Sequence, residues 1–255
     1  MELIRLTIDG AVALVTLDRP PVNALSEEMA LELEEAFEAC RSPEVRAVVV
    51  TGQPHFAAGG DIKGFQASFD RGDKDRTAWT LQTAITTLDS LEKPTIAAVH
   101  GYALGGGLEL SLGCDFRYLA DDAQIGQPEI LLGLIPGAGG TQRLPRVVGY
   151  QRAKEMIYTG RQVGADEAMN IGLADKVAPS SDLLDLAVAD AHDWATKATQ
   201  AIAAAKKALN DGSALPVDQG VLVEKAAFQE SFFSDDAREG VAAFLEKREA
   251  NFKGS

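Results

Sequence analysis

Apolar and polar residues alternate from Leu3 to Leu17, on both sides of the pair Asp9-Gly10. A period of two is typical of a strand with one buried face, and an Asp-Gly pair favours the two-residue turn of a β-hairpin. The pattern therefore predicts that the fold begins with a hairpin.

A helix and a buried strand follow. Apolar residues recur at helical spacing from Met29 to Cys40, after Ser26, a residue type that caps helix N-termini. The next apolar run, Ala47–Thr51, is rich in valine and ends at Gly52, which predicts a buried strand. This order of strand, helix and strand indicates an α/β protein.

The same order recurs further along the chain. Two more buried strands are predicted at Thr95–Val99 and Phe116–Ala120, and between them the stretch GYALGGGLEL, residues 101–110, predicts a helix that begins at three consecutive glycines. The polar segment Gln66–Ala78 predicts a loop or a frayed helix start, before a helix that extends through Leu91.

Helical spacing dominates after Gly139, apart from a strand candidate at Ala174–Val177. We interpret residues 1–179 as an α/β core that contains the candidate site. Residues 180–255 are interpreted as a helical C-terminal region.

Composition narrows the classes of function. The chain is 46% hydrophobic and carries a net charge of -14, and this acidic balance argues against nucleic acid as a principal partner. Its only cysteines are Cys40 and Cys114, without the spacing of metal ligands. No apolar run is long enough to span a membrane, and the first residues lack a basic leader. We therefore expect a cytoplasmic protein that binds neither metal nor membrane.

Two glycine turns are candidates for ligand binding: Gly59-Gly60-Asp61 and Gly105-Gly106-Gly107. Glycine removes the side chain that would keep a ligand away from the backbone, and amides in the first turn of a helix lack intrahelical partners. Neither turn matches a nucleotide-binding GxGxxG or GxxxxGKS/T motif. A single Gly-Gly pair more often only permits a tight turn or close helix packing, so the glycines alone do not establish a ligand site.

Two glutamates accompany these turns. Glu109 follows Gly106 by three residues, so its side chain leans back toward the start of the predicted helix. Glu129 lies between Pro128 and an apolar run, which indicates a dry environment. An isolated glutamate is usually a surface residue, but the apolar neighbours of both glutamates weaken that interpretation here.

Several segments resemble one family. The stretches GYALGGGLELSLGCD (101–115) and GQPEILLGLIPGAGGTQRLPRVVG (126–149) resemble signature segments of the enoyl-CoA hydratase/isomerase family, the crotonases. The similarity extends to PPVNALSEEM, FAAGGDIK and REGVAAFLEKREANF, and in detail it is greatest to short-chain enoyl-CoA hydratases. The resemblance implies an α/β crotonase (ClpP-like) fold, with repeated ββα units in a spiral core. It also implies that the helical C-terminal region mediates oligomerisation and completes the coenzyme A site.

The resemblance also implies roles for particular residues. The amides of Gly60 and Gly106 match the two oxyanion-hole donors, and Glu109 and Glu129 match the catalytic glutamates of hydratases. Family positions that line the coenzyme A channel fall on Ala24, Asp61, Ile62 and Lys63. Gly60 stands where the family commonly has alanine.

The implied activity is the syn addition of water to a trans-2-enoyl-CoA, which gives the 3-hydroxyacyl-CoA, as in fatty acid β-oxidation. We expect Glu109 to activate the water and Glu129 to supply the proton at C2. Coenzyme A is part of the substrate, no cofactor is required, and a homotrimer or homohexamer is implied. Segment Gln66–Trp79 matches no family pattern, so the acyl preference stays open.

Alternative functions are a double-bond isomerase, a hydratase of a branched or aromatic-pathway acyl-CoA, and a non-enzymatic acyl-CoA- or RNA-binding scaffold. Isomerases generally lack the first glutamate, so the presence of both favours hydration.

Other residues invite simpler interpretations. His55, His100 and His192 are interpreted as structural, and Cys114 as a buried thiol. Lys206 and Lys207 are interpreted as solvated, with a phosphate of coenzyme A as the alternative partner. Phe244 is either a core aromatic or a neighbour of the adenine of another subunit.

Overall fold

The computed structural model describes residues 1–72 and 76–254. In these residues the strands form a six-stranded sheet, in the order β1-β2-β3-β4-β6-β9, and a three-stranded sheet, in the order β5-β7-β8. The strands are β1 (Ile4–Asp9), β2 (Val12–Leu17), β3 (Ala47–Gly52), β4 (Thr95–Val99), β5 (Tyr102–Leu104), β6 (Phe116–Ala120), β7 (Gln124–Gly126), β8 (Gln162–Gly164) and β9 (Lys176–Ala178).

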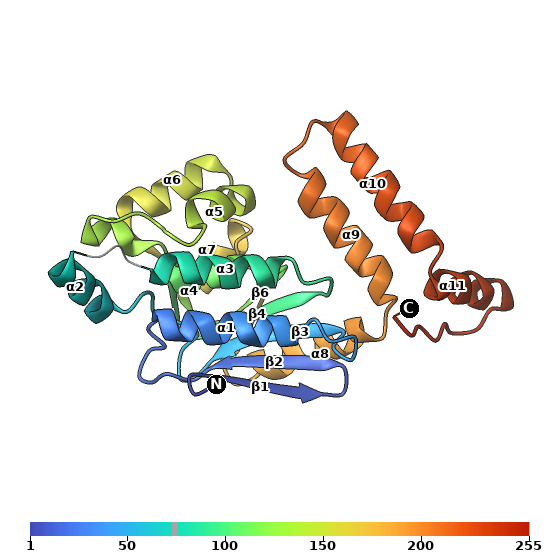
Figure 1. Ribbon diagram of the computed structural model, residues 1–255, viewed down its shortest axis with the longest axis horizontal. Helices are drawn as coiled ribbons and strands as arrows, with labels where there is room; N and C mark the ends of the chain where they lie inside the picture. Colours follow the sequence, from blue (N-terminus) through green and yellow to red (C-terminus); the bar gives the residue numbers. More distant parts are fainter. Residues whose placement is uncertain (73–75, 255) are drawn as a thin grey trace.

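Helices cover the larger sheet and form the C-terminal part of the molecule (Figure 1). They are α1 (Glu27–Ala39), α2 (Ile62–Arg71), α3 (Thr77–Asp89), α4 (Gly106–Leu112), the 3-10 helix η1 (Pro128–Leu132), α5 (Gly140–Val148), α6 (Tyr150–Thr159), α7 (Ala165–Asn170), α8 (Leu183–Ala195), α9 (Thr199–Gly212), α10 (Val217–Phe232) and α11 (Asp235–Glu246).

The predicted N-terminal hairpin is confirmed. Strands β1 and β2 are antiparallel, with Asp9 opposite Val12, and the remaining pairs of the larger sheet are parallel. Parallel neighbours need crossover connections, and helices supply several of them. The predicted strands at 47–51, 95–99 and 116–120 are all present in this sheet.

Strand β3 is buried along its whole length. Helix α8 packs against β3 and β4, while α1 and α3 pack against each other (Figure 1). A strand covered on both faces needs an unbroken apolar run, which explains the valines of β3. Helix α1 begins where the sequence predicts, because the Ser26 side chain accepts a hydrogen bond from the Met29 amide at 3.2 Å.

The interpretation of segment 66–78 as a loop or frayed helix start is wrong for residues 66–71. Helix α2 continues to Arg71 and ends at Gly72, whose φ of 70° is left-handed. Its apolar residues Ile62, Phe65 and Phe69 share one face, a spacing that the charged residues around them obscure in the sequence. Residues 73–75 of the same segment lie outside the described residues.

The small sheet was not predicted, because its three-residue strands are too short to show a period. It nevertheless positions the candidate site. Strands β5 and β7 are parallel, with Leu104 opposite Gly126, and the Gly105 amide donates to the Gly126 carbonyl at 2.9 Å. The turn before α4 and the chain that leads into η1 therefore leave the sheet side by side.

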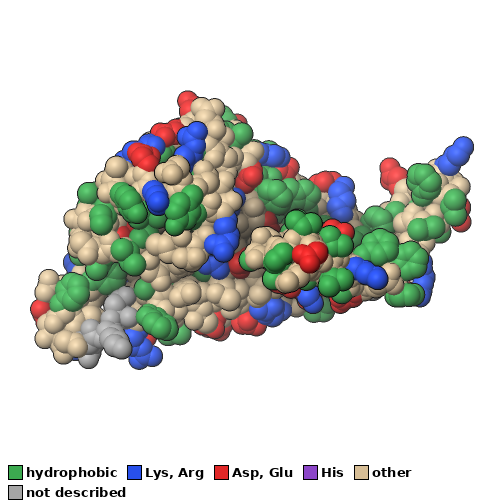
Figure 2. All heavy atoms as spheres, turned by 90° about the horizontal axis from the view of Figure 1, so that it is seen from above, with side chains coloured by type: hydrophobic (Ala, Val, Ile, Leu, Met, Phe, Trp, Pro, Cys, Tyr) green, Lys and Arg blue, Asp and Glu red, His purple; other side chains and the backbone are tan. Residues whose placement is uncertain are grey.

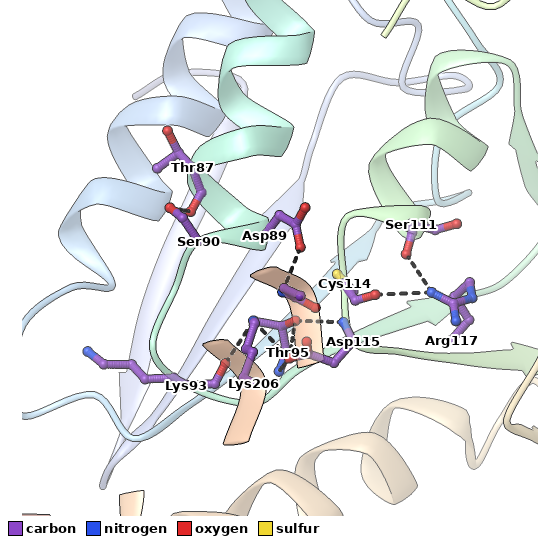
Figure 3. Close-up of polar contacts among 11 residues, drawn as sticks. Thr87, Asp89, Ser90, Lys93, Thr95, Ser111, Cys114, Asp115, Arg117 and Lys206 are labelled. Atoms are coloured by element: carbon purple, nitrogen blue, oxygen red, sulfur yellow. Dashed lines mark hydrogen bonds and ion pairs between the residues drawn. The ribbon is translucent and has the colours of Figure 1, made fainter. Parts of the chain in front are cut away.

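Helices α9 and α10 form a hairpin that extends away from the α/β part of the molecule, and α11 follows it (Figure 1). Lys206 on α9 contacts the α/β part, because its Nζ donates to Asp115 Oδ2 at 3.0 Å and to the Lys93 carbonyl at 3.2 Å (Figure 3). The division at residue 179 stays a prediction; helix α8, just beyond it, packs on the larger sheet.

No helix among residues 1–72 and 76–254 combines the length and apolar composition needed to cross a membrane.

Candidate active site

A cavity of about 340 Å³ lies where the turn before α4, the chain around η1 and helices α2 and α3 meet. It brings together the two predicted oxyanion glycines, Gly60 and Gly106, and the two predicted catalytic acids, Glu109 and Glu129. Most of the remaining wall is apolar, and it includes Leu25, Ile62, Phe65, Phe69, Leu81, Leu132, Leu134 and Ile135.

Glu109 is held at the first turn of α4 and is only 3% exposed. Its Oε1 accepts hydrogen bonds from the amides of Ala138 and Gly140, both at 2.7 Å. Between these residues, Gly139 has a φ of 110°, a backbone conformation that favours glycine and turns both amides toward one oxygen. The carboxyl is therefore fixed from the start of α5.

Burial raises the pKa of the Glu109 carboxyl above its ordinary value, because an apolar environment disfavours the ionised form. The Gly140 and Ala138 amides oppose this rise, as does the positive charge of Arg143. The two amides fix the orientation of the carboxyl and favour its ionised form.

Glu129 is half-buried in the first turn of η1. In the amide orientation that satisfies its neighbours, Gln127 Nε2 donates to Glu129 Oε1 at 2.7 Å and to Oε2 at 3.1 Å. The carboxyl also lies against Gly105, where a Cβ atom would stand 3.1 Å from Oε1. The φ of Gly105 is 52°, a left-handed conformation that favours glycine. Any other residue here would also bring its Cβ atom against the Glu129 carboxyl.

Burial raises the pKa of Glu129 to about 7, and the negative charge of Glu109 contributes to the rise. The second effect means that the protonation of one carboxyl depends on that of the other. Two groups that interact in this way titrate as a pair.

Among the described residues, the amides of Gly60 and Gly106 have no hydrogen-bond acceptor in the protein. Leu25 bonds on either side of Gly60: its amide donates to the Gly59 carbonyl at 2.8 Å, and its carbonyl accepts from the Asp61 amide at 2.9 Å. Gly106 begins α4, where an amide has no intrahelical acceptor. Within residues 1–72 and 76–254, neither N–H donates to a protein acceptor. Both glycines line the cavity.

The four residues predicted to line a coenzyme A channel lie at one junction. Ile62 lines the cavity, and Asp61 caps α2 by accepting from the Lys63 amide at 3.1 Å. Arg19 links Asp61 and Ala24: it pairs with Asp61 Oδ2 at 2.7 Å and donates to the Ala24 carbonyl. The hydrogen bond from Arg19 lowers the pKa of Asp61. Lys63 is exposed.

Sequence reasoning missed several residues of this site. Gln127 and the Ala138 and Gly140 amides orient the carboxyls, although only the glycine run GAGG at 137–140 gave a local signal of an unusual turn.

Two interpretations outside the site are also corrected. Lys206 is not solvated, since its side chain is 10% exposed and pairs with Asp115, and Phe244 is not a core residue, because it is 83% exposed.

Two carboxyls of raised pKa and two unpaired amides line one cavity. A site of this kind on an α/β fold is typical of an enzyme that uses acid–base catalysis. Residues 7–255 match the family described as enoyl-CoA hydratase/isomerase. The chain belongs to this family.

Curated relatives support the assignment along the whole chain. The chain is 40% identical to a probable enoyl-CoA hydratase of Bacillus subtilis, covering 100% of both chains. It is also 40% identical to a crotonyl-CoA hydratase of Syntrophomonas wolfei, covering 98% of each. The short-chain-enoyl-CoA hydratase of Clostridium acetobutylicum is 39% identical, with 94% of this chain and 93% of the relative covered.

Solved structures confirm the predicted crotonase fold. An enoyl-CoA hydratase from Bacillus anthracis superposes with a TM-score of 0.93 at 37% identity, covering 99% of this chain and 100% of that one. One from Geobacillus kaustophilus gives a TM-score of 0.95 at 32% identity, covering 99% and 97%.

Proposed function

We propose that this protein is an enoyl-CoA hydratase, a hydro-lyase that adds water syn across the double bond of a trans-2-enoyl-CoA to give the 3-hydroxyacyl-CoA. The observation that carries the proposal is the meeting of Glu109, Glu129 and the unpaired Gly60 and Gly106 amides at one cavity. The names of the relatives support the same reaction.

The two amides supply the electrostatic part of the mechanism. As water adds at C3, negative charge moves onto the thioester oxygen, and N–H donors fixed in advance stabilise it there. One such donor typically contributes about 2.7–4 kcal/mol of barrier lowering. Gly60 and Gly106 come from separate turns, so the oxygen would be held from two directions.

The carboxyls supply the acid–base part. Burial raises the pKa of Glu109, which makes its carboxylate a stronger base, and the amide donors on Oε1 oppose part of that rise and hold the group in place. Both effects suit it to deprotonate the water that attacks C3. Glu129, with a pKa of about 7, holds a proton at neutral pH and is suited to protonate C2. Glu109 gains the proton that water loses, and Glu129 loses the proton that C2 gains, so the negative charge passes from Glu109 to Glu129. The addition of water changes no net oxidation state, so no electron acceptor is needed.

The substrate proposed on the same grounds is an acyl-CoA thioester, with its acyl group in the apolar cavity and its coenzyme A part beside Ala24, Asp61, Ile62 and Lys63. A double-bond isomerase needs no activated water. The presence of a second carboxyl at the cavity therefore supports hydration over isomerisation.

The test is the hydration of crotonyl-CoA, followed by the loss of the ultraviolet absorbance of the enoyl thioester. We expect turnover by the wild-type protein and a loss of about 10²- to 10⁴-fold in kcat for Glu109→Gln and for Glu129→Gln, because each removes an acid–base group while keeping its shape. Glu35→Gln, an exposed position on α1, is the matched control. Near-normal turnover in both active-site variants would remove the carboxyls from the mechanism. A wild-type protein without turnover would refute the proposed hydratase activity.

A further inference from the structure

Three apolar side chains fill the space that a side chain on Gly60 or Gly106 would occupy. A Cβ atom on Gly106 would lie 2.9 Å from Leu81 Cδ2 and 3.0 Å from Leu25 Cδ1, and one on Gly60 would lie 2.8 Å from Phe65 Cζ. All five residues line the same cavity. We call Leu25, Phe65 and Leu81 the apolar collar.

Space, rather than backbone conformation, is what glycine provides at these two positions. Neither Gly60 nor Gly106 has a φ in the left-handed region, so both backbones are open to other residues. Carbon atoms in contact are about 3.5–4.0 Å apart. The collar atoms lie nearer than this to the positions that Cβ atoms on Gly60 and Gly106 would take, so a side chain there would clash with them. The collar and the two glycines therefore form one packing unit.

Phe65 differs from the other collar members in its support. Leu25 and Leu81 belong to the hydrophobic core, with 0% and 3% of their surfaces exposed. Phe65 is half-buried on α2, and it is the far end of its ring that meets Gly60. Its replacement would thus reshape the collar without opening a void in the core.

We propose that Phe65, seated against Gly60, makes the site selective for straight-chain enoyl-CoA thioesters over those branched at C2. This inference rests on the proposed function. If the Gly60 amide holds the thioester oxygen, the carbonyl carbon C1 bears that oxygen and C2 is bonded to C1. C2 is then the carbon of the acyl chain beyond the carbonyl that lies nearest Gly60, the residue against which the ring packs. A methyl group on C2 then competes with the ring for space, whereas an unbranched chain does not.

The ratio of kcat/KM for crotonyl-CoA to that for tiglyl-CoA, its 2-methyl derivative, measures this selectivity. One methyl group in an apolar pocket changes such a ratio by about 10- to 200-fold, and this is the preference we expect of the wild type. Phe65→Ala should remove most of it, because the space of the ring becomes available to the methyl group. A ratio in Phe65→Ala within about twofold of the wild type would overturn the proposal.

Gly60→Ala tests the contact itself. The new methyl group would force the ring of Phe65 to move away by about 1 Å. Both residues line the cavity, so the ring would move into the space that the acyl group would occupy. The crotonyl preference should therefore increase. In Gly60→Ala/Phe65→Ala the increase should vanish, because the ring is gone, and the double variant should match Phe65→Ala. Equal effects of Gly60→Ala with and without the ring would contradict the inference.

Gly64→Ala is the matched control. It makes the same change four residues further on, where the nearest atom to the new Cβ atom would be 3.9 Å away, on Asp61. Its substrate ratio should equal that of the wild type.

Binding separates this inference from the proposed function. Butyryl-CoA and isobutyryl-CoA have equal numbers of carbon atoms and no double bond, so their dissociation constants, measured by calorimetry, need no turnover. A wild type that prefers butyryl-CoA, with the preference lost in Phe65→Ala, would support the collar even if no hydration were found. Equal binding of the two by the wild type would refute the collar and leave hydration standing.

Discussion

Glu129 combines a raised pKa with a proposed role that depends on its proton. Burial, reinforced by the charge of Glu109, places this pKa at about 7. If Glu129 is the acid at C2, its deprotonation removes the reactive form. The value of kcat/KM for crotonyl-CoA should therefore fall, by about tenfold per pH unit, as the pH rises beyond about 7. Initial rates across this range measure the basic limb of the profile.

The stability of the folded protein gives an independent reading of the same pKa. The folded state holds the Glu129 proton more tightly than the unfolded state, whose pKa is near the ordinary 4.5. The resulting stability is complete below that value and is lost as the pH rises through about 7. Glu129→Gln cannot ionise, so it should gain stability over the wild type above about pH 7 and lose that advantage toward about pH 4. A difference that does not change with pH would contradict the raised pKa.

Helix α9 is fastened to the end of α4 by the pair Lys206–Asp115. Asp115 Oδ2 also accepts from the Thr95 amide at 2.8 Å and from the Thr95 hydroxyl at 2.9 Å, and Figure 3 shows these groups converging on one carboxylate. Lys206→Met leaves this largely buried carboxylate without its cation. We expect the free energy of unfolding to fall by about 2 kcal/mol, as measured by urea denaturation.

The neighbouring lysine supplies the control for this prediction. Lys207 is the next residue of α9 and is exposed, so Lys207→Met should change the free energy of unfolding by less than about 0.5 kcal/mol. If both variants lose the same free energy of unfolding, the loss comes from replacing a lysine on α9 in general and not from breaking the Lys206–Asp115 ion pair.

The long elements could be predicted from the sequence because each carries a complete pattern within its own residues. Ser26 with its apolar spacing placed α1, and the valine run placed β3. The strand expected at 174–177 lies at Lys176–Ala178, since a three-residue strand contains too little pattern to fix its ends. Helix α2 was missed for a related reason: Ile62, Phe65 and Phe69 are too few over its ten residues to show a helical period among the polar residues and glycine between them.

The candidate site could be predicted only in part. The glycine turns and the two glutamates stand in segments with a family resemblance, and they lie together at one cavity. Gln127 carries no such local signal, because its contact with Glu129 depends on the path of η1. The contact of Phe65 with Gly60 likewise requires the placement of α2 against the glycine turn.

At the scale of the whole molecule, helices α9, α10 and α11 expose large apolar side chains. Figure 2 shows hydrophobic side chains gathered over this part of the molecule. On α10 they include Val217, Val221, Leu222, Phe228 and Phe232, each more than half exposed. A monomer rarely leaves such a surface in water, so these helices support the proposal of a homotrimer or homohexamer.

Charge makes the apolar helices the strongest candidate for the contact between subunits. Each chain carries a net charge of -14, and like-charged chains repel one another, so association must draw on apolar burial. Leu222→Asp puts a carboxylate into this surface and should shift the native mass, measured by sedimentation, from a multiple of 27.0 kDa toward that of one chain. Gln229→Asp adds the same charge at an exposed polar position of α10 and should leave the assembly intact. A wild type that sediments as a single chain would refute the proposed oligomer, and an intact Leu222→Asp assembly would place the contact on another surface.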